Sequence, residues 1–254
     1  MEAVSRKPLQ GIGNILRFNW HFYAAVIVAL AVLHLIKWFL PPVLHPFIGI
    51  VALLIILTTV ASLFASVYVY DLSGLYDLNW LKLSVKPGAP MANIHAGFDE
   101  TSALLAQKYP QATLTVFDFY DPKKHTEVSI KRARKVYPPY PGTRAISTIN
   151  VPLPSQSVDA VFCILSAHEI REDGERSFFF AQLREALKSD GRIVVVEHLR
   201  DLPNFLAYSI GAFHFHSGAT WRQTFSSAGL CIERQQKLTP FITVYTLQKN
   251  GNPS

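Results

Sequence analysis

The first 70 residues are nearly free of charge, whereas the rest of the chain is not. Glu2, Arg6, Lys7, Arg17 and Lys37 are the only charged residues in this stretch of the 254-residue chain. Charged residues make up about a quarter of an ordinary soluble domain. The sequence therefore predicts two parts of different kinds.

Cysteine is also scarce, since Cys163 and Cys231 are the only two. Two thiols form neither a disulfide framework nor a cysteine-based zinc site. Half of the residues are hydrophobic and 17 are Phe, which excludes a disordered chain. The net charge is +6 and no helix-turn-helix or zinc-finger motif is present, so we expect no nucleic-acid partner.

Two uncharged runs, residues 18–36 and 38–70, are each long enough to cross a bilayer. Pro41-Pro42 ends the first helix and permits a tight turn. We therefore predict a transmembrane hairpin over residues 19–40 and 43–70. Two buried core helices of a soluble protein are the alternative.

Basic residues set the expected orientation of this hairpin. Arg6, Lys7 and Arg17 precede the first span, and the turn between the spans has no Lys or Arg beyond Lys37. Lys and Arg concentrate on the cytoplasmic side of membrane proteins. We expect both termini on that side, in a membrane of the bacterial inner-membrane type.

The remainder of the chain alternates short apolar runs with amphipathic segments, which is typical of βαβ units and a parallel sheet. The expected strands are 92–96, 113–117, 144–149, 158–165 and 192–197, and the expected helices are 100–108, 126–136 and 175–188. Residues 231–236 and 241–248 flank a turn, so we expect a terminal hairpin whose last strand runs antiparallel to the others. The predicted parts are an N-terminal segment (1–18), the hairpin (19–70), a juxtamembrane linker (71–90), the α/β domain (91–249) and a tail (250–254).

Three segments of this domain resemble class I S-adenosylmethionine-dependent methyltransferases. Residues 151–162 are similar to the stretch that leads into the family's fourth strand. Residues 183–196 are similar to its next helix, glycine turn and fifth strand, and residues 217–230 to the helix before its terminal hairpin. The resemblance implies an α/β fold, a Rossmann-like sheet of parallel strands with a terminal antiparallel hairpin, and S-adenosylmethionine as cofactor.

The resemblance also implies where the cofactor binds, because this kind of sheet binds ligands at the carboxyl ends of its strands. Gly97 allows close backbone approach, and Asp118 ends the second strand, where a carboxylate accepts the ribose hydroxyls. Alternatively, Asp118 caps a helix or a turn. The full set of expected cofactor residues is Ala96, Gly97, Phe98, Asp118, Phe119, Ser147 and Leu165.

His168, Glu169 and His198 are the expected catalytic residues. The ordinary pKa of histidine suits a general base, so His168 is predicted to take the proton of a hydroxyl acceptor, with Glu169 to orient it. Phe205, Tyr208 and Phe213 are expected to line the same pocket. The alternative is that these polar residues cap local turns.

A metal ion is not expected from the sequence. Glu197, His198, His214 and His216 are acceptable ligand types, but their spacing matches no metal-binding motif.

The expected function is methylation of a lipophilic small molecule, because a membrane anchor brings the enzyme to an acceptor dissolved in the bilayer. We consider an alkylated or polyene-bearing aromatic hydroxyl, a quinone precursor or a lipid. Six Lys and Arg between residues 123 and 135 add membrane lipid as an expected partner. The single glycine of the loop at 97–102 leaves one alternative open, a catalytically silent membrane scaffold with the same fold.

Overall fold

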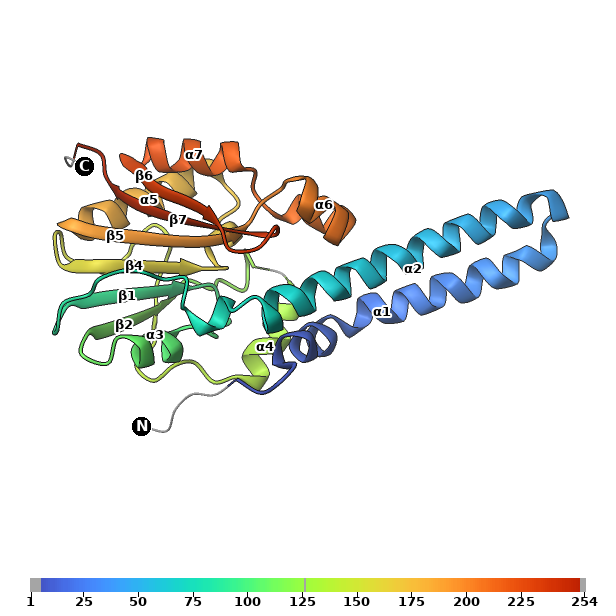
Figure 1. Cartoon of the computed structure of the whole chain (residues 1–254), viewed down its shortest axis with the longest axis horizontal. Helices are drawn as coiled ribbons and strands as arrows, with labels where there is room; N and C mark the ends of the chain where they lie inside the picture. Colours follow the sequence, from blue (N-terminus) through green and yellow to red (C-terminus); the bar gives the residue numbers. More distant parts are fainter. Residues whose placement is uncertain (1–5, 126, 252–254) are drawn as a thin grey trace.

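A rod of two antiparallel helices projects from an α/β body (Figure 1). The structure is a computed structural model that describes residues 6–125 and 127–251. The rod consists of α1 (Gln10–Ile36) and α2 (His45–Val67). The turns η1 (Lys37–Phe39) and η2 (Pro42–Leu44) connect them, as the proline pair predicts.

Both helices of the rod are candidate membrane spans by length and composition. The qualifying segments, Gln10–Phe39 and Pro42–Asp77, have mean hydropathies of 2.0 and 2.7, and their most apolar windows are not buried inside the protein. Their exposed side chains include Ile27, Leu35 and Leu57. In water, an apolar surface of this extent is unfavourable.

The first helix begins earlier than predicted, at Gln10 rather than near residue 19. Asn19 has non-helical torsion angles (φ −114°, ψ 18°), which bend α1 at the place where the apolar run starts. Residues 10–18 are thus the first turns of α1, and they lie against the α/β body rather than forming a separate segment.

Asp71 fixes the start of α1 from the far end of the rod's second helix. It lies in η3 (Tyr68–Leu72), and its two carboxylate oxygens accept the backbone N–H groups of Gly11 and Ile12 at 2.8 and 2.9 Å. A carboxylate at this place satisfies amides that have no partner inside the helix and favours the positive end of its dipole. A Cβ on Gly11 would lie 2.4 Å from that of Tyr70, so only glycine permits this contact.

The body is built on one seven-stranded sheet of order β3-β2-β1-β4-β5-β7-β6. Its strands are β1 (Pro90–His95), β2 (Thr113–Asp118), β3 (Arg144–Ala145), β4 (Val158–Ile164), β5 (Leu187–His198), β6 (Leu230–Lys237) and β7 (Ile242–Lys249). The five neighbouring strands β3, β2, β1, β4 and β5 are parallel. Strand β7 pairs antiparallel with β5 and with β6. The antiparallel β7 is therefore an inner strand, because β6 forms the edge.

Helices and the segment after the rod cover the two faces of the sheet. The helices are α3 (Ser102–Lys108), α4 (Val128–Val136), α5 (Asp173–Ala186), α6 (Leu202–Tyr208) and α7 (Gly218–Ser227). Phe180 of α5 and Trp221 of α7 are buried against one face. Leu75 and Leu78 are buried against the other, so the predicted linker is part of the core.

One predicted strand differs clearly from the structure. The expected strand at 144–149 contains only the two residues of β3, because Ser147 and Asn150 pair with each other in a turn instead. Helix α6, expected after the fifth strand without stated bounds, begins at Leu202 and has Pro203 at its second position, and the carboxylate of Asp201 accepts the Asn204 N–H. The expected start of the helix at residue 126 lies outside the described residues.

Replacing Asp71 with Ala is expected to lower the free energy of unfolding by about 1–2 kcal/mol, because two helix N-terminal amides lose their acceptor. Thermal unfolding of the detergent-purified protein measures this. Asp77→Ala is the control, since Asp77 is exposed and lies in the same segment. Equal stability of the two variants would contradict the assigned role of Asp71.

Candidate active site

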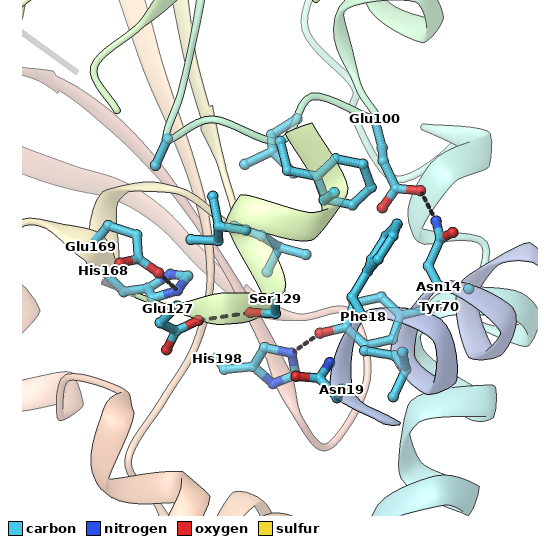
Figure 2. A pocket seen from close by; sticks show the side chains of 18 of the residues that line it. Asn14, Phe18, Asn19, Tyr70, Glu100, Glu127, Ser129, His168, Glu169 and His198 are labelled. Atoms are coloured by element: carbon cyan, nitrogen blue, oxygen red, sulfur yellow. Dashed lines mark hydrogen bonds and ion pairs between the residues drawn. The ribbon is translucent and has the colours of Figure 1, made fainter. Parts of the chain in front are cut away.

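A cavity of about 310 Å³ opens where the strand order of the sheet reverses, between β1 and β4. This is the place where open α/β sheets bind ligands. The loops after β1, β4 and β5 form one part of its wall, and α4 and the first turns of α1 form the rest (Figure 2). The base of the rod is thus a wall of the pocket.

Glu100 attaches the rod to this wall. Its carboxylate accepts hydrogen bonds from the Arg6 guanidinium (2.7 Å), the Asn14 amide (3.2 Å) and the Tyr76 hydroxyl (2.8 Å). The ring of Phe18 packs edge-on against Phe98 beside it, with centroids 5.9 Å apart. Three separate chain segments therefore converge on one carboxylate at the rim of the cavity.

Three of the seven expected cofactor residues line this cavity: Ala96, Phe98 and Leu165. The other four, Gly97, Asp118, Phe119 and Ser147, are not among the residues that line it. Phe119 packs in the core, its ring 5.7 Å from that of Phe179, and Ser147 is exposed beyond the short edge strand β3. Both positions follow from tertiary packing that their place in the sequence does not reveal.

Gly97 makes the close approach that a glycine permits, but to the protein itself. Its φ is +94°, and a Cβ there would lie 2.9 Å from the ring of Tyr120 and 3.1 Å from Ile130. Any larger residue would therefore push Tyr120 away from the loop. The guanidinium of Arg134 lies over the ring of Tyr120, 4.4 Å from the ring centroid.

Asp118 ends β2 beside this loop, and both of its oxygens already have partners. One accepts a hydrogen bond from Arg134, and the other accepts the backbone N–H of Tyr120 at 2.9 Å. The side chain of Arg134 is 39% exposed. An ion pair this exposed contributes at most about 1 kcal/mol, so a ribose can displace Arg134 at small cost. If Arg134 moves away from Asp118, the carboxylate is free to accept the ribose hydroxyls of the expected cofactor.

His168 contacts two carboxylates, those of Glu197 and of Glu169, the residue expected to orient it. The Nδ1 of His168 lies 2.6 Å from Glu197 Oε2, and its backbone N–H donates to Glu197 Oε1 at 3.1 Å. Its other ring nitrogen lies 3.4 Å from Glu169 Oε1. Burial opposes a charge on His168, but the two carboxylates outweigh it and hold the pKa of His168 well above 6.5.

His198 also lines the cavity, but both of its nitrogens are engaged. Nδ1 donates to the Asn204 side-chain oxygen at 3.0 Å, and Nε2 accepts from the Tyr70 hydroxyl at 3.0 Å. Burial lowers the pKa of His198 to about 4, so the ring is neutral at pH 7. It stacks on Phe215 with centroids 4.7 Å apart, which makes it a wall residue.

The segment after α6 places its side chains differently from the prediction. Phe205 and Phe213 are exposed, and His214 and Phe215 line the cavity instead. This occurs because residues 209–214 form the 3₁₀ turn η6 (Ser209–His214), which shifts the faces of the segment. His216 points elsewhere, into a buried contact with Arg176.

Other residues of the wall were missed by the sequence analysis. Asn14 and Phe18 come from α1, Glu100 from the loop before α3, and Glu127 from the start of α4. The Nδ1 of His214 lies 3.3 Å from Glu127 Oε1. No motif marks these residues, since they meet only through tertiary contacts between α1, the loop before α3 and α4.

One family model matches part of the body of the protein. Residues 94–195, from the end of β1 to the middle of β5, match a family model described as a methyltransferase domain. No curated protein matches the chain.

Solved structures share the fold at low sequence identity. An S-adenosylmethionine-dependent methyltransferase from Methanosarcina mazei is 13% identical, with a TM-score of 0.50, over 68% of this chain and 97% of that one. A geranyl diphosphate methyltransferase in complex with S-adenosylmethionine is 14% identical, with a TM-score of 0.50, over 73% of this chain and 88% of that one. At such identities the likeness concerns the fold alone.

Replacing Arg134 with Met is expected to tighten binding of S-adenosylhomocysteine up to about fivefold, because Asp118 is then free. Asp118→Ala should weaken binding about 10- to 100-fold, through loss of hydrogen bonds to a charged acceptor. Calorimetric titration of the detergent-purified variants measures both.

Lys135→Met is the matched control, since it removes a neighbouring exposed charge and leaves Asp118 unchanged. Weaker binding in the Arg134 variant would show instead that Arg134 holds the cofactor.

Proposed function

The body of this protein is an S-adenosylmethionine-dependent methyltransferase domain, and from that premise we propose that the chain is a membrane-anchored enzyme that methylates a lipophilic acceptor. The observation that carries the proposal is the shared wall: the first turns of a helix long and apolar enough to span a bilayer line the cavity of the methyltransferase domain. An acceptor that leaves the bilayer along this helix arrives at the cavity directly.

The cofactor supplies a methyl group on a sulfonium, which an acceptor atom displaces in line. In this chain, the ribose would displace Arg134 and donate its hydroxyls to Asp118. Ala96, Phe98 and Leu165 would form the surface against which the rest of the cofactor lies. The enzyme's part in such a displacement is mainly proximity and orientation of the two reactants.

The acceptor atom is, in our proposal, a hydroxyl oxygen on an aromatic ring. His168 and Glu169 face the cavity, and Figure 2 shows them on the side opposite Glu100 and Asn14. Placed between these two sides, a hydroxyl would lie beside His168 and Glu169, and we assign its activation to them. The aromatic rings of Phe18, Phe98 and Phe215 offer an apolar surface for the acceptor ring.

The surface beside the rod supports a position of the body against the bilayer. Leu202, Leu206 and Ile210 of α6 and η6 are largely exposed, and Ile210 is 82% exposed. A groove of about 560 Å³ between α2 and α6 is lined almost entirely by apolar side chains, including Phe64 and Phe241. A segment of this kind next to a spanning helix is favourable at the boundary between headgroups and acyl chains.

A fold neighbour lends support to the acceptor class. The solved geranyl diphosphate methyltransferase shares the fold, and the geranyl diphosphate in its name is an isoprenoid. An isoprenoid or alkyl tail is the feature that we propose for the acceptor of this chain.

The full chain is expected to remain in the membrane pellet after alkaline carbonate extraction, because two spans hold it through hydrophobic burial rather than through surface charge. Membrane fractionation with immunodetection measures this. Recovery of the folded protein in the supernatant would contradict the anchored arrangement and leave the methyltransferase domain unaffected.

Turnover is expected to depend on the acceptor's tail. In a series of phenols with lengthening alkyl chains, kcat/KM should rise up to about fourfold for each CH₂, the equivalent of about 0.8 kcal/mol of apolar burial, until it levels off. A methyl-transfer assay in detergent or nanodiscs measures this. The same value for all tail lengths would exclude a lipophilic acceptor.

His168→Gln should lower kcat by about 10²-fold or more without changing S-adenosylhomocysteine affinity, because it removes a group beside the reacting hydroxyl. His34→Gln is the control, since His34 is exposed on α1 far along the rod. Full turnover in the His168 variant would remove this residue from the reaction.

A further inference from the structure

Three polar side chains converge at one end of the cavity: His168, Glu169 and His214. We call them the acceptor cluster. The Nε2 atoms of the two histidines each lie 3.4 Å from Glu169 Oε1, and the three atoms lie within 4.8 Å of one another. His168 and Glu169 come from the turn η5 (Ala167–Glu169) after β4, and His214 comes from η6.

The two nitrogen–oxygen separations of 3.4 Å match those between ligands of one metal ion. Metal–nitrogen and metal–oxygen bonds of about 2.0–2.1 Å at tetrahedral angles place neighbouring ligand atoms about 3.4 Å apart. Two imidazoles and one carboxylate form a donor set that suits Zn²⁺, Fe²⁺, Co²⁺ or Mn²⁺ better than Mg²⁺ or Ca²⁺.

Both histidines are held in the orientation that metal ligands require. The far nitrogen of His168 lies 2.6 Å from Glu197, and the far nitrogen of His214 lies 3.3 Å from Glu127. A carboxylate behind each imidazole orients the ring so that its Nε2 faces the cluster, where a metal ion would take the place of a proton. Glu197 is fully buried, so its position is rigid.

Two further observations point to a ligand at this place. The Nε2 of His214 is buried and makes no hydrogen bond among the described residues. Arg171 donates to the backbone carbonyls of both His168 and His214, which ties the two ligand-bearing turns together. The Arg171 guanidinium therefore donates to backbone oxygens rather than to the carboxylate of Glu169.

We propose that the acceptor cluster binds one divalent transition-metal ion, with Glu197 and Glu127 as the residues that position its imidazoles. All three ligands line the cavity, so the remaining coordination positions face the acceptor. This inference rests on the proposed function only in its last step, in which the acceptor hydroxyl binds the ion. There the hydroxyl loses its proton to water, and its oxygen is held as the anion that takes the methyl group from sulfur.

The site differs from the candidate set that the sequence offered. Of Glu197, His198, His214 and His216, only His214 is a ligand. Glu197 stands behind a ligand, His198 is engaged by Tyr70 and Asn204, and His216 contacts Arg176. His168 and Glu169 were expected to act on the acceptor, not on a metal.

The test is metal binding by the full-length, detergent-purified protein after treatment with a chelator. Titration with Co²⁺, followed by its visible absorption, and with Zn²⁺, followed by calorimetry, should show one ion per chain. His214→Ala should weaken binding by at least 100-fold. Glu127→Gln should weaken it about 10- to 100-fold, because Glu127 positions His214 without touching the ion. His34→Gln should bind as the native chain does.

S-adenosylhomocysteine titration of the same samples separates the two proposals. Cofactor binding without metal binding would overturn the metal site and leave the methyltransferase assignment standing. Metal binding without cofactor binding would do the reverse. One ion bound equally well by native protein and the His214 variant would also overturn the site, since the ion would then lie elsewhere. Glu127→Gln keeps the test valid if His214→Ala fails to fold, because Glu127 is 42% exposed.

Discussion

The carboxylate of Glu100 is the point on which the arrangement of this protein depends. It accepts hydrogen bonds from Arg6, Asn14 and Tyr76, which belong to the segment before α1, to α1 itself and to the segment after α2. These contacts hold the base of the rod against the loop after β1. The wall that α1 provides to the cavity therefore depends in part on these hydrogen bonds.

Two carboxylates behind the cavity give its far end a negative field. Glu197 is completely buried at the end of β5, and Glu169 is nearly so. A buried carboxylate is stable only beside positive charge or strong donors. His168 lies between the two in the described structure. The same field draws a cation to the acceptor cluster, so the local electrostatics of the site and the proposed metal have one origin.

In our proposal, the position of the cavity places the methyl-transfer site close to the bilayer. Its wall includes the kinked start of α1, and the apolar surface of α6 and η6 lies beside α2 (Figure 1). Residues that contact the bilayer in our proposal therefore share a segment with residues that line the cavity, as Ile210 and His214 of η6 do. A lipophilic acceptor would need to move only a short way from the bilayer to the cofactor.

The sequence by itself determined the two apolar helices, the order of the main strands and the terminal hairpin, because charge depletion, periodicity and proline act locally. The sequence also predicted Ala96, Phe98, Leu165 and His168 as residues of the site, since the ends of the strands can be located from the alternation of apolar and polar segments. The tertiary structure alone decided that α1 begins at residue 10 and walls the cavity, that Arg134 covers Asp118, and that His214 joins His168 and Glu169. These depend on contacts between segments far apart in the chain, and no local pattern encodes such distances.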